Sequence, residues 1–123
     1  MADPYIHNFA PVVNYNTVKK TTFQILVGET ALTLAPLVLT GASICMIVKD
    51  SEDSSKKLEV LTTENGKITI TDATHFDINE RIVKYPNRTA EHGYDVLIKL
   101  PDYVYKTYVK GVVSIIATYQ DPV

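Results

Sequence analysis

The chain is poor in cysteine, glycine and tryptophan: of its 123 residues, one is cysteine, five are glycine and none is tryptophan. A single cysteine cannot form an intrachain disulfide, nor a metal site built from several thiolates. Cys45 lies in the apolar run 44–48, so we expect a buried, unreactive thiol. The fold is therefore expected to form without redox chemistry, as in a reducing cytoplasm.

Charge of one sign is not in excess either. The net charge is −2, so there is no electrostatic case for binding nucleic acid. The most apolar long stretch, residues 31–48, is interrupted by Thr33, Pro36 and Gly41, and we expect no membrane span. Residues 1–16 lack the basic start and apolar core of a secretory signal, so none is expected.

No catalytic or metal-binding pattern stands out. The histidines His7, His75 and His92 are scattered without ligand spacing, and we expect surface positions for His75 and His92. There is no Gly-x-Ser-x-Gly turn and no glycine-rich phosphate loop. The acidic segment 50–55 lacks the glycine and the final glutamate of an EF-hand, which favours a solvated loop. We predict a protein that is not an enzyme and has no cofactor or metal.

Short segments with period-two alternation dominate what is present. In residues 93–100 the apolar Tyr94, Val96 and Ile98 alternate with mostly polar neighbours, and Pro101 closes the run. This pattern predicts a strand with one buried and one solvated face. Such a strand requires a second layer to cover its apolar face.

Similar runs recur along the chain and are separated by turn residues. They cover residues 20–27, 30–34, 42–49, 58–62, 67–71 and 105–119. Several short strands at spacings of about ten residues, without helices between them, predict an antiparallel β-sandwich. We assign this domain to residues 17–123.

Three places in or between these segments carry residues whose position in the fold can be predicted. Leu32 and Leu34 are expected to face the core. Asn65-Gly66 is expected to close a hairpin between the two strands that flank it, because Asn-Gly tolerates the positive φ angles of a tight turn. Gly111 indicates either a β-bulge or the close approach of another backbone.

Residues 1–16 form a separate, extended N-terminal arm. The arm is apolar and aromatic, contains Pro4 and Pro11, and carries a single charge, Asp3. Disordered tails are usually charged and poor in aromatic residues. We therefore expect the arm to lie against either its own domain or a neighbouring subunit, and the sequence leaves both open.

Tyrosine is abundant, with eight residues, and Tyr103, Tyr105 and Tyr108 cluster near one end of the last two strands. Tyrosine is enriched at interfaces but also favours strands, so we interpret the cluster as an interface, with edge-strand packing as the alternative. Tyr94 is a candidate corner tyrosine that bonds back to the preceding loop. The candidate protein-interface residues are Tyr5, Ile6, Phe9, Val12, Val13, Tyr15, Tyr103, Tyr105 and Tyr108.

Four segments carry related strand and turn motifs. They read LTGASI at 39–44, LTTENGKITI at 61–70, GYDVLI at 93–98 and KGVVSI at 110–115. Together they resemble the small immunoglobulin-like virion proteins of tailed bacteriophages, such as the amino-terminal domain of baseplate upper proteins. The resemblance covers residues 23–116, and Gly93 directly precedes Tyr94 where that family has a spacer.

The resemblance implies an immunoglobulin-like antiparallel β-sandwich of about seven strands. It also implies a structural component of the virion, made in the host bacterial cytoplasm, that acts as a protein–protein adaptor or decoration protein at the tail, baseplate, neck or capsid. Its partners would be other virion proteins and copies of itself in a symmetric assembly. The alternative is a carbohydrate-binding β-sandwich module, in which tyrosines stack on the sugar rings of a glycan.

Overall fold

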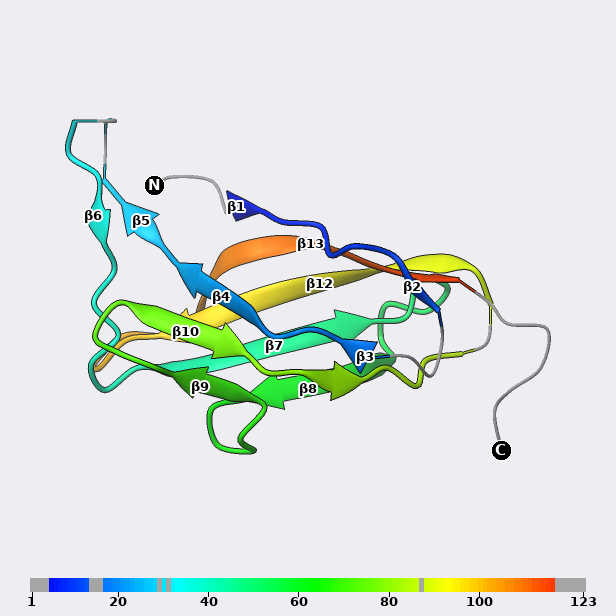
Figure 1. Cartoon of the computed structure of the whole chain (residues 1–123). Helices are drawn as coiled ribbons and strands as arrows, with labels where there is room; N and C mark the ends of the chain where they lie inside the picture. Colours follow the sequence, from blue (N-terminus) through cyan, green and yellow to red (C-terminus); the bar gives the residue numbers. More distant parts are fainter. Residues whose placement is uncertain (1–4, 14–16, 29, 31, 87, 117–123) are drawn as a thin grey trace.

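The computed structural model describes residues 5–13, 17–28, 30, 32–86 and 88–116, without the side chains of Tyr5, Val12 and Val13. Every regular element among them is a β-strand (Figure 1). The strands are β1 (Tyr5–Ile6), β2 (Val12–Val13), β3 (Thr17–Val18), β4 (Thr21–Gln24), β5 (Leu26–Val27), β6 (Ala35–Pro36), β7 (Ser43–Lys49), β8 (Lys57–Thr62), β9 (Ile68–Ile70), β10 (His75–Ile78), β11 (Arg81–Ile82), β12 (Ala90–Lys99) and β13 (Lys106–Ile116).

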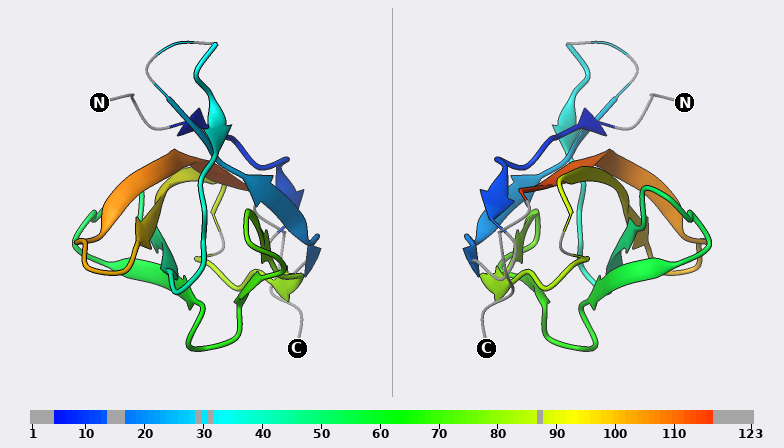
Figure 2. Two further views of the ribbon diagram at one scale, coloured as in Figure 1. Left: turned by 90° about the vertical axis from the view of Figure 1, so that its left-hand side faces the viewer. Right: turned by 90° about the vertical axis from the view of Figure 1, so that its right-hand side faces the viewer.

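The strands form two main sheets and two short pairs. The larger sheet has the order β1-β13-β12-β7-β8, with β2 also paired to β13, and the smaller sheet has the order β4-β10-β9. Strand β11 pairs with β3, and β5 pairs with β6. Figure 2 shows the two main sheets as two layers seen from their ends. The fold is therefore all-β and resembles a sandwich.

Period-two alternation places the core between these layers. Ile44, Met46 and Val48 of β7 are completely buried, and Val96 and Ile98 of β12 are at most 1% exposed. Their inward orientation was expected from the sequence and is confirmed. The smaller sheet contributes the other side of the core.

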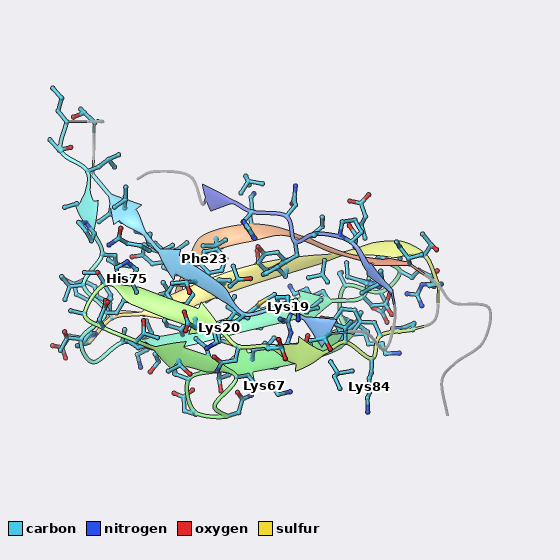
Figure 3. The ribbon with its side chains drawn as sticks, viewed as in Figure 1. Lys19, Lys20, Phe23, Lys67, His75 and Lys84 are labelled. Carbon is cyan, nitrogen blue, oxygen red and sulfur yellow. The ribbon has the colours of Figure 1, made fainter. Side chains whose placement is uncertain are left out.

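Aromatic packing supports this side of the core. Phe23 of β4, which is labelled in Figure 3, stacks on Phe76 of β10 with ring centroids 5.4 Å apart. Phe76 is completely buried. Lys19 and Lys20 lie on the outside of the same layer, where they approach Glu80 and Asp77 at 3.7 and 3.9 Å.

The expected hairpin across Asn65-Gly66 is wrong. The turn itself forms, with a φ of 80° at Gly66, and the Asn65 side chain accepts hydrogen bonds from the backbone N–H groups of Thr62 and Lys67. However, β8 pairs with β7, whereas β9 pairs with β10. The turn therefore carries the chain from the larger sheet to the smaller one.

The last strand ends at Ile116, and residues 117–119 of the expected run lie outside the described residues. Its pairing with β12 shifts register between Val96 and Leu97, away from Gly111. Of the two alternatives for Gly111, the bulge is thus excluded, which leaves the close approach of another backbone.

Candidate functional site

The N-terminal segment, residues 5–13, lies along the outer edge of β13 (Figure 1). β1 and β2 both pair with β13 in parallel, with Ile6 opposite Lys110 and Val12 opposite Ile115. Between them, the backbone N–H of His7 donates to Lys110 O at 2.9 Å, and the N–H of Phe9 donates to Val112 O at 3.1 Å. The arm therefore lies against its own domain, which is one of the two expected positions.

Gly111 allows this close approach. A Cβ atom at position 111 would lie 1.8 Å from the carbonyl oxygen of His7 and 2.9 Å from Oδ1 of Asn8. The Tyr94 hydroxyl donates a hydrogen bond of 2.6 Å to that same His7 oxygen. The Tyr94 hydroxyl thus donates to the arm, whereas a corner tyrosine donates to the loop before it, so the expected corner role is wrong.

Phe9 anchors the segment to the core. Its side chain is 7% exposed and lies 5.3 Å from the Tyr94 ring, measured between centroids. The Arg81 guanidinium lies 5.9 Å from the centroid of the Phe9 ring, within the range of a cation–π interaction. As a candidate interface residue, Phe9 is unavailable to another protein while the segment holds this position.

The other candidate residues of the arm differ in exposure. Ile6 is 54% exposed and remains available to a partner. The backbones of Tyr5, Val12 and Val13 pair with β13, and their side chains lie outside the described part of the structure. Tyr15 also lies outside the described residues.

A buried ion pair lies beneath the segment. Nε of Arg81 donates to both carboxylate oxygens of Glu59, at 3.0 and 3.1 Å, and the Tyr85 hydroxyl donates to Glu59 as well. The two charged side chains are 7% and 11% exposed. Burial raises the pKa of Tyr85, with the negative charge of Glu59 as a second cause. Within the described residues, neither Nη1 nor Nη2 of Arg81 has a hydrogen-bond partner.

His92 forms part of a second polar cluster in the interior. Its ring is completely buried, so the expected surface position is wrong. Nδ1 accepts a hydrogen bond from the Ser51 backbone N–H at 3.2 Å, and the ring meets Tyr85 edge to face. Asp50 beside it is also buried and forms an ion pair with Arg88. The sequence signal for an inward His92 is its parity with Tyr94 and Val96 on β12.

The pKa of His92 predicts a pH-dependent stability. Burial lowers this pKa below the ordinary 6.5; Arg88 also lowers it, whereas Asp50 and Glu52 oppose the shift. The unfolded chain therefore binds a proton at higher pH than the folded chain. We expect the free energy of unfolding to be highest above pH 6.5 and to fall as the pH decreases toward the folded pKa.

Urea unfolding at pH 7.5 and at pH 5.5, about one unit to either side of the ordinary histidine pKa, measures the difference in the free energy of unfolding between the two pH values. The His92→Gln variant is expected to show a much smaller difference in stability between the two pH values. His75→Gln is the matched control, because His75 is partly exposed and pairs with Asp72. The effect of Asp50 falls in a lower window: a hydrogen bond from the Glu52 backbone N–H lowers its pKa from 3.8. A difference that persists in the His92 variant would contradict the assignment.

A second candidate surface is the hairpin formed by β5 and β6. It projects beyond both layers at one end of the domain (Figures 1 and 2). Leu32 is 98% exposed and Leu34 is 47% exposed, so their expected inward orientation is wrong. Leu26 and Val38 are 51% and 58% exposed. The expected strand over residues 30–34 is wrong, because the chain turns here between β5 and β6, with the Thr33 N–H donating to Thr30 O at 3.0 Å.

The loop between β12 and β13 lies at the same end of the domain (Figure 1). Tyr103, Val104 and Tyr105 are 70%, 82% and 46% exposed. A Cβ atom at Gly41, in the connection that follows the hairpin, would lie 2.9 Å from Pro101 Cγ of this loop. Tyr108 is different: it is partly buried and packs against the core.

We call these exposed side chains the apolar end. It consists of Leu26, Leu32, Leu34, Val38, Tyr103, Val104 and Tyr105. Residues 25–48 contain a single charged residue, Glu29, so the hairpin side of this surface is almost without charge. Of the candidate interface residues, Tyr103 and Tyr105 lie exposed on this surface, together with five aliphatic residues that were not among those candidates.

The thiol of Cys45 is only partly buried, so the expected full burial is wrong. Burial nevertheless raises its pKa, which favours the neutral, less nucleophilic form. Among the described residues, no three His, Cys, Asp or Glu side chains come close enough together to hold a metal ion. No helix that could span a membrane was found among the described residues.

Comparison with known proteins adds no functional evidence. No protein-family model matches the chain, and no curated protein matches it significantly.

Proposed function

We propose that this chain is a structural component of a tailed-bacteriophage virion that acts as a protein–protein adaptor or decoration protein, by binding and not by catalysis. The observation that carries the proposal is the apolar end, with Leu32 at 98% exposure on a projecting hairpin. A two-stranded hairpin without a covering layer is marginally stable in water. Large apolar side chains left exposed in this way are typical of binding surfaces.

The strand order supports the immunoglobulin-like arrangement that the motifs imply. In that fold one sheet contains strands B, E and D, and the other contains C, F and G. The smaller sheet, β4-β10-β9, corresponds to B-E-D, and β7, β12 and β13 correspond to C, F and G. With β8 beside β7, these strands make up the seven-stranded framework that we propose.

The proposal predicts that Leu32→Asp weakens incorporation into virions. Burying one leucine at an interface contributes about 1.5–3 kcal/mol, and a charge there adds a desolvation cost. We expect incorporation to fall about tenfold or more, because 1.4 kcal/mol corresponds to a factor of ten. The measurement is the amount of the chain in purified particles after complementation of a phage that lacks it.

Ile82→Asp is the matched control. Ile82 is an exposed aliphatic residue on β11, 58% exposed, and is not part of the apolar end. We expect this variant to enter particles about as well as the wild type. Equal incorporation of the Leu32 and Ile82 variants, or virions that never contain the chain, would refute the proposal.

Carbohydrate binding is the second candidate, favoured by the exposure of Tyr103 and Tyr105 on one loop. Aromatic rings at such positions stack on sugar rings. Calorimetric titration with polysaccharides separates the two functions. Binding that is lost in Tyr105→Ala and retained in Leu32→Asp would favour the carbohydrate-binding module over the adaptor.

A further inference from the structure

The outer edge of β13 fits a segment that places a backbone carbonyl opposite Gly111 and an aromatic ring two residues later. The missing side chain at Gly111 leaves room for a backbone carbonyl, and the Tyr94 hydroxyl donates to that carbonyl. The Val112 N–H donates to Oδ1 of Asn8 at 3.2 Å. Two residues beyond the carbonyl, an aromatic ring must fill the slot that Phe9 occupies. We call this edge, with its slot, the acceptor groove.

An empty acceptor groove would be costly. Without Phe9, the buried Arg81 guanidinium would lose the ring that lies 5.9 Å away. Phe23, which is 5.2 Å from the His7 ring, would also lose part of its cover. The part of β13 that the segment covers, residues 109–116, would become an unprotected sheet edge, which natural proteins avoid. Release of one segment is therefore favourable only when another segment takes its place.

The segment that fills the groove can leave without disturbing the rest of the fold. It lies on the outside of the larger sheet, along the edge of β13 (Figure 1). Its backbone pairs with β13, and the Tyr94 hydroxyl of β12 donates to the His7 oxygen. A second copy of the chain carries the same segment and would make the same contacts, as in exchange of an identical element between protomers.

We propose that the acceptor groove takes the N-terminal segment of a second copy of this chain in exchange for its own. This inference rests on the proposed function, because a virion would hold many copies of the chain close together. Such proximity favours exchange of segments between copies. The contacts are the same within one chain and between chains, so local concentration decides between them. A tethered segment has an effective concentration on the order of millimolar, which neighbours in a symmetric assembly can match.

Disulfide trapping between two full-length chains tests the exchange. In a Cys45→Ser background, the donor carries Ile6→Cys and Gly111→Ala, and a receiver of different size carries Lys110→Cys. Ile6 and Lys110 are register partners across the parallel pair. The donor cannot hold its own segment, because a Cβ atom at 111 overlaps His7 O. We expect a disulfide-linked heterodimer on a non-reducing gel.

A matched pair of receivers makes the result specific to the groove. A receiver that also carries Gly111→Ala is expected to give at least about tenfold less heterodimer, since loss of one or two kcal/mol of contacts suffices for that. A receiver that carries Gly93→Ala is expected to behave like the parent receiver, because a Cβ atom there meets nothing within 4 Å. Equal yields from all receivers would overturn the proposal.

A second measurement does not depend on disulfide geometry. A fluorescent peptide of residues 1–16 is titrated with the wild-type chain, at concentrations up to about 1 mM to compete with the tethered segment. Binding that is lost with the Gly111→Ala chain supports exchange, and no binding to the wild-type chain overturns it. Failure here leaves the adaptor function intact, because that function is tested by Leu32→Asp in virions.

Discussion

Glu59→Ala is expected to lower the free energy of unfolding by about 3–5 kcal/mol, because breaking one partner of a buried ion pair leaves an uncompensated charge. The stranded charge is Arg81, whose side chain is 7% exposed and whose Nη1 and Nη2 have no hydrogen-bond partner among the described residues. The Tyr85 hydroxyl would lose its acceptor as well. Urea denaturation at neutral pH measures the change.

Two further variants establish that the loss comes from the isolated charge. The double variant Glu59→Leu with Arg81→Met is expected to be more stable than Glu59→Ala, because replacing both partners by apolar side chains removes the buried charge. Glu80→Ala breaks the exposed pair with Lys19, whose side chains are 56% and 84% exposed, and is expected to cost less than about 1 kcal/mol. A Glu59→Ala loss as small as that of Glu80→Ala would show that Arg81 finds compensation elsewhere.

Gly111→Ala is the second large effect that we expect. The added Cβ atom would lie 1.8 Å from a backbone oxygen and 2.7 Å from the backbone carbon of His7, so the N-terminal segment must leave β13. Its departure removes Phe9 from the core, and loss of a buried phenylalanine costs about 3–5 kcal/mol. We expect a loss of about 2–4 kcal/mol in urea unfolding, together with fast amide exchange at residues 7 and 9.

Gly93→Ala is the control for this effect. Gly93 lies on β12 next to Tyr94, the residue that pairs with Gly111, and has open space where its Cβ atom would be. Alanine in a strand interior is favoured over glycine by about 0.5–1 kcal/mol, so this variant is expected to match or slightly exceed the wild type. If both variants lost the same stability, the approach of His7 to Gly111 would not be the cause.

Much of the β architecture could be predicted from alternation alone. The buried faces of β7 and β12 follow from their apolar residues at every second position, because side chains on a strand alternate between two faces. The same rule failed for Leu32 and Leu34, because the chain turns between β5 and β6 at this point and forms no strand. Apolar residues at every second position do not by themselves establish a strand or a layer that covers it.

Pairings between distant residues were harder to predict. Asn65-Gly66 determines a local turn, but the partner of each flanking strand depends on apolar surfaces elsewhere in the chain. Gly111 signalled a close backbone approach, yet nothing near it in sequence identified His7 as the neighbour. His92 was misplaced because its polarity was given more weight than its position on the inward face of β12.

The parallel pairing of β1 with β13 determines how the molecule bears tension. Force applied at the two chain ends pulls β1 toward its beginning and β13 toward its end, so the strands would have to slide past each other. The backbone bonds at His7 and Phe9 and the Tyr94 hydroxyl bond would then be loaded together in shear, and not opened one after another. A chain held by both ends within a larger particle would resist stretching first at this edge.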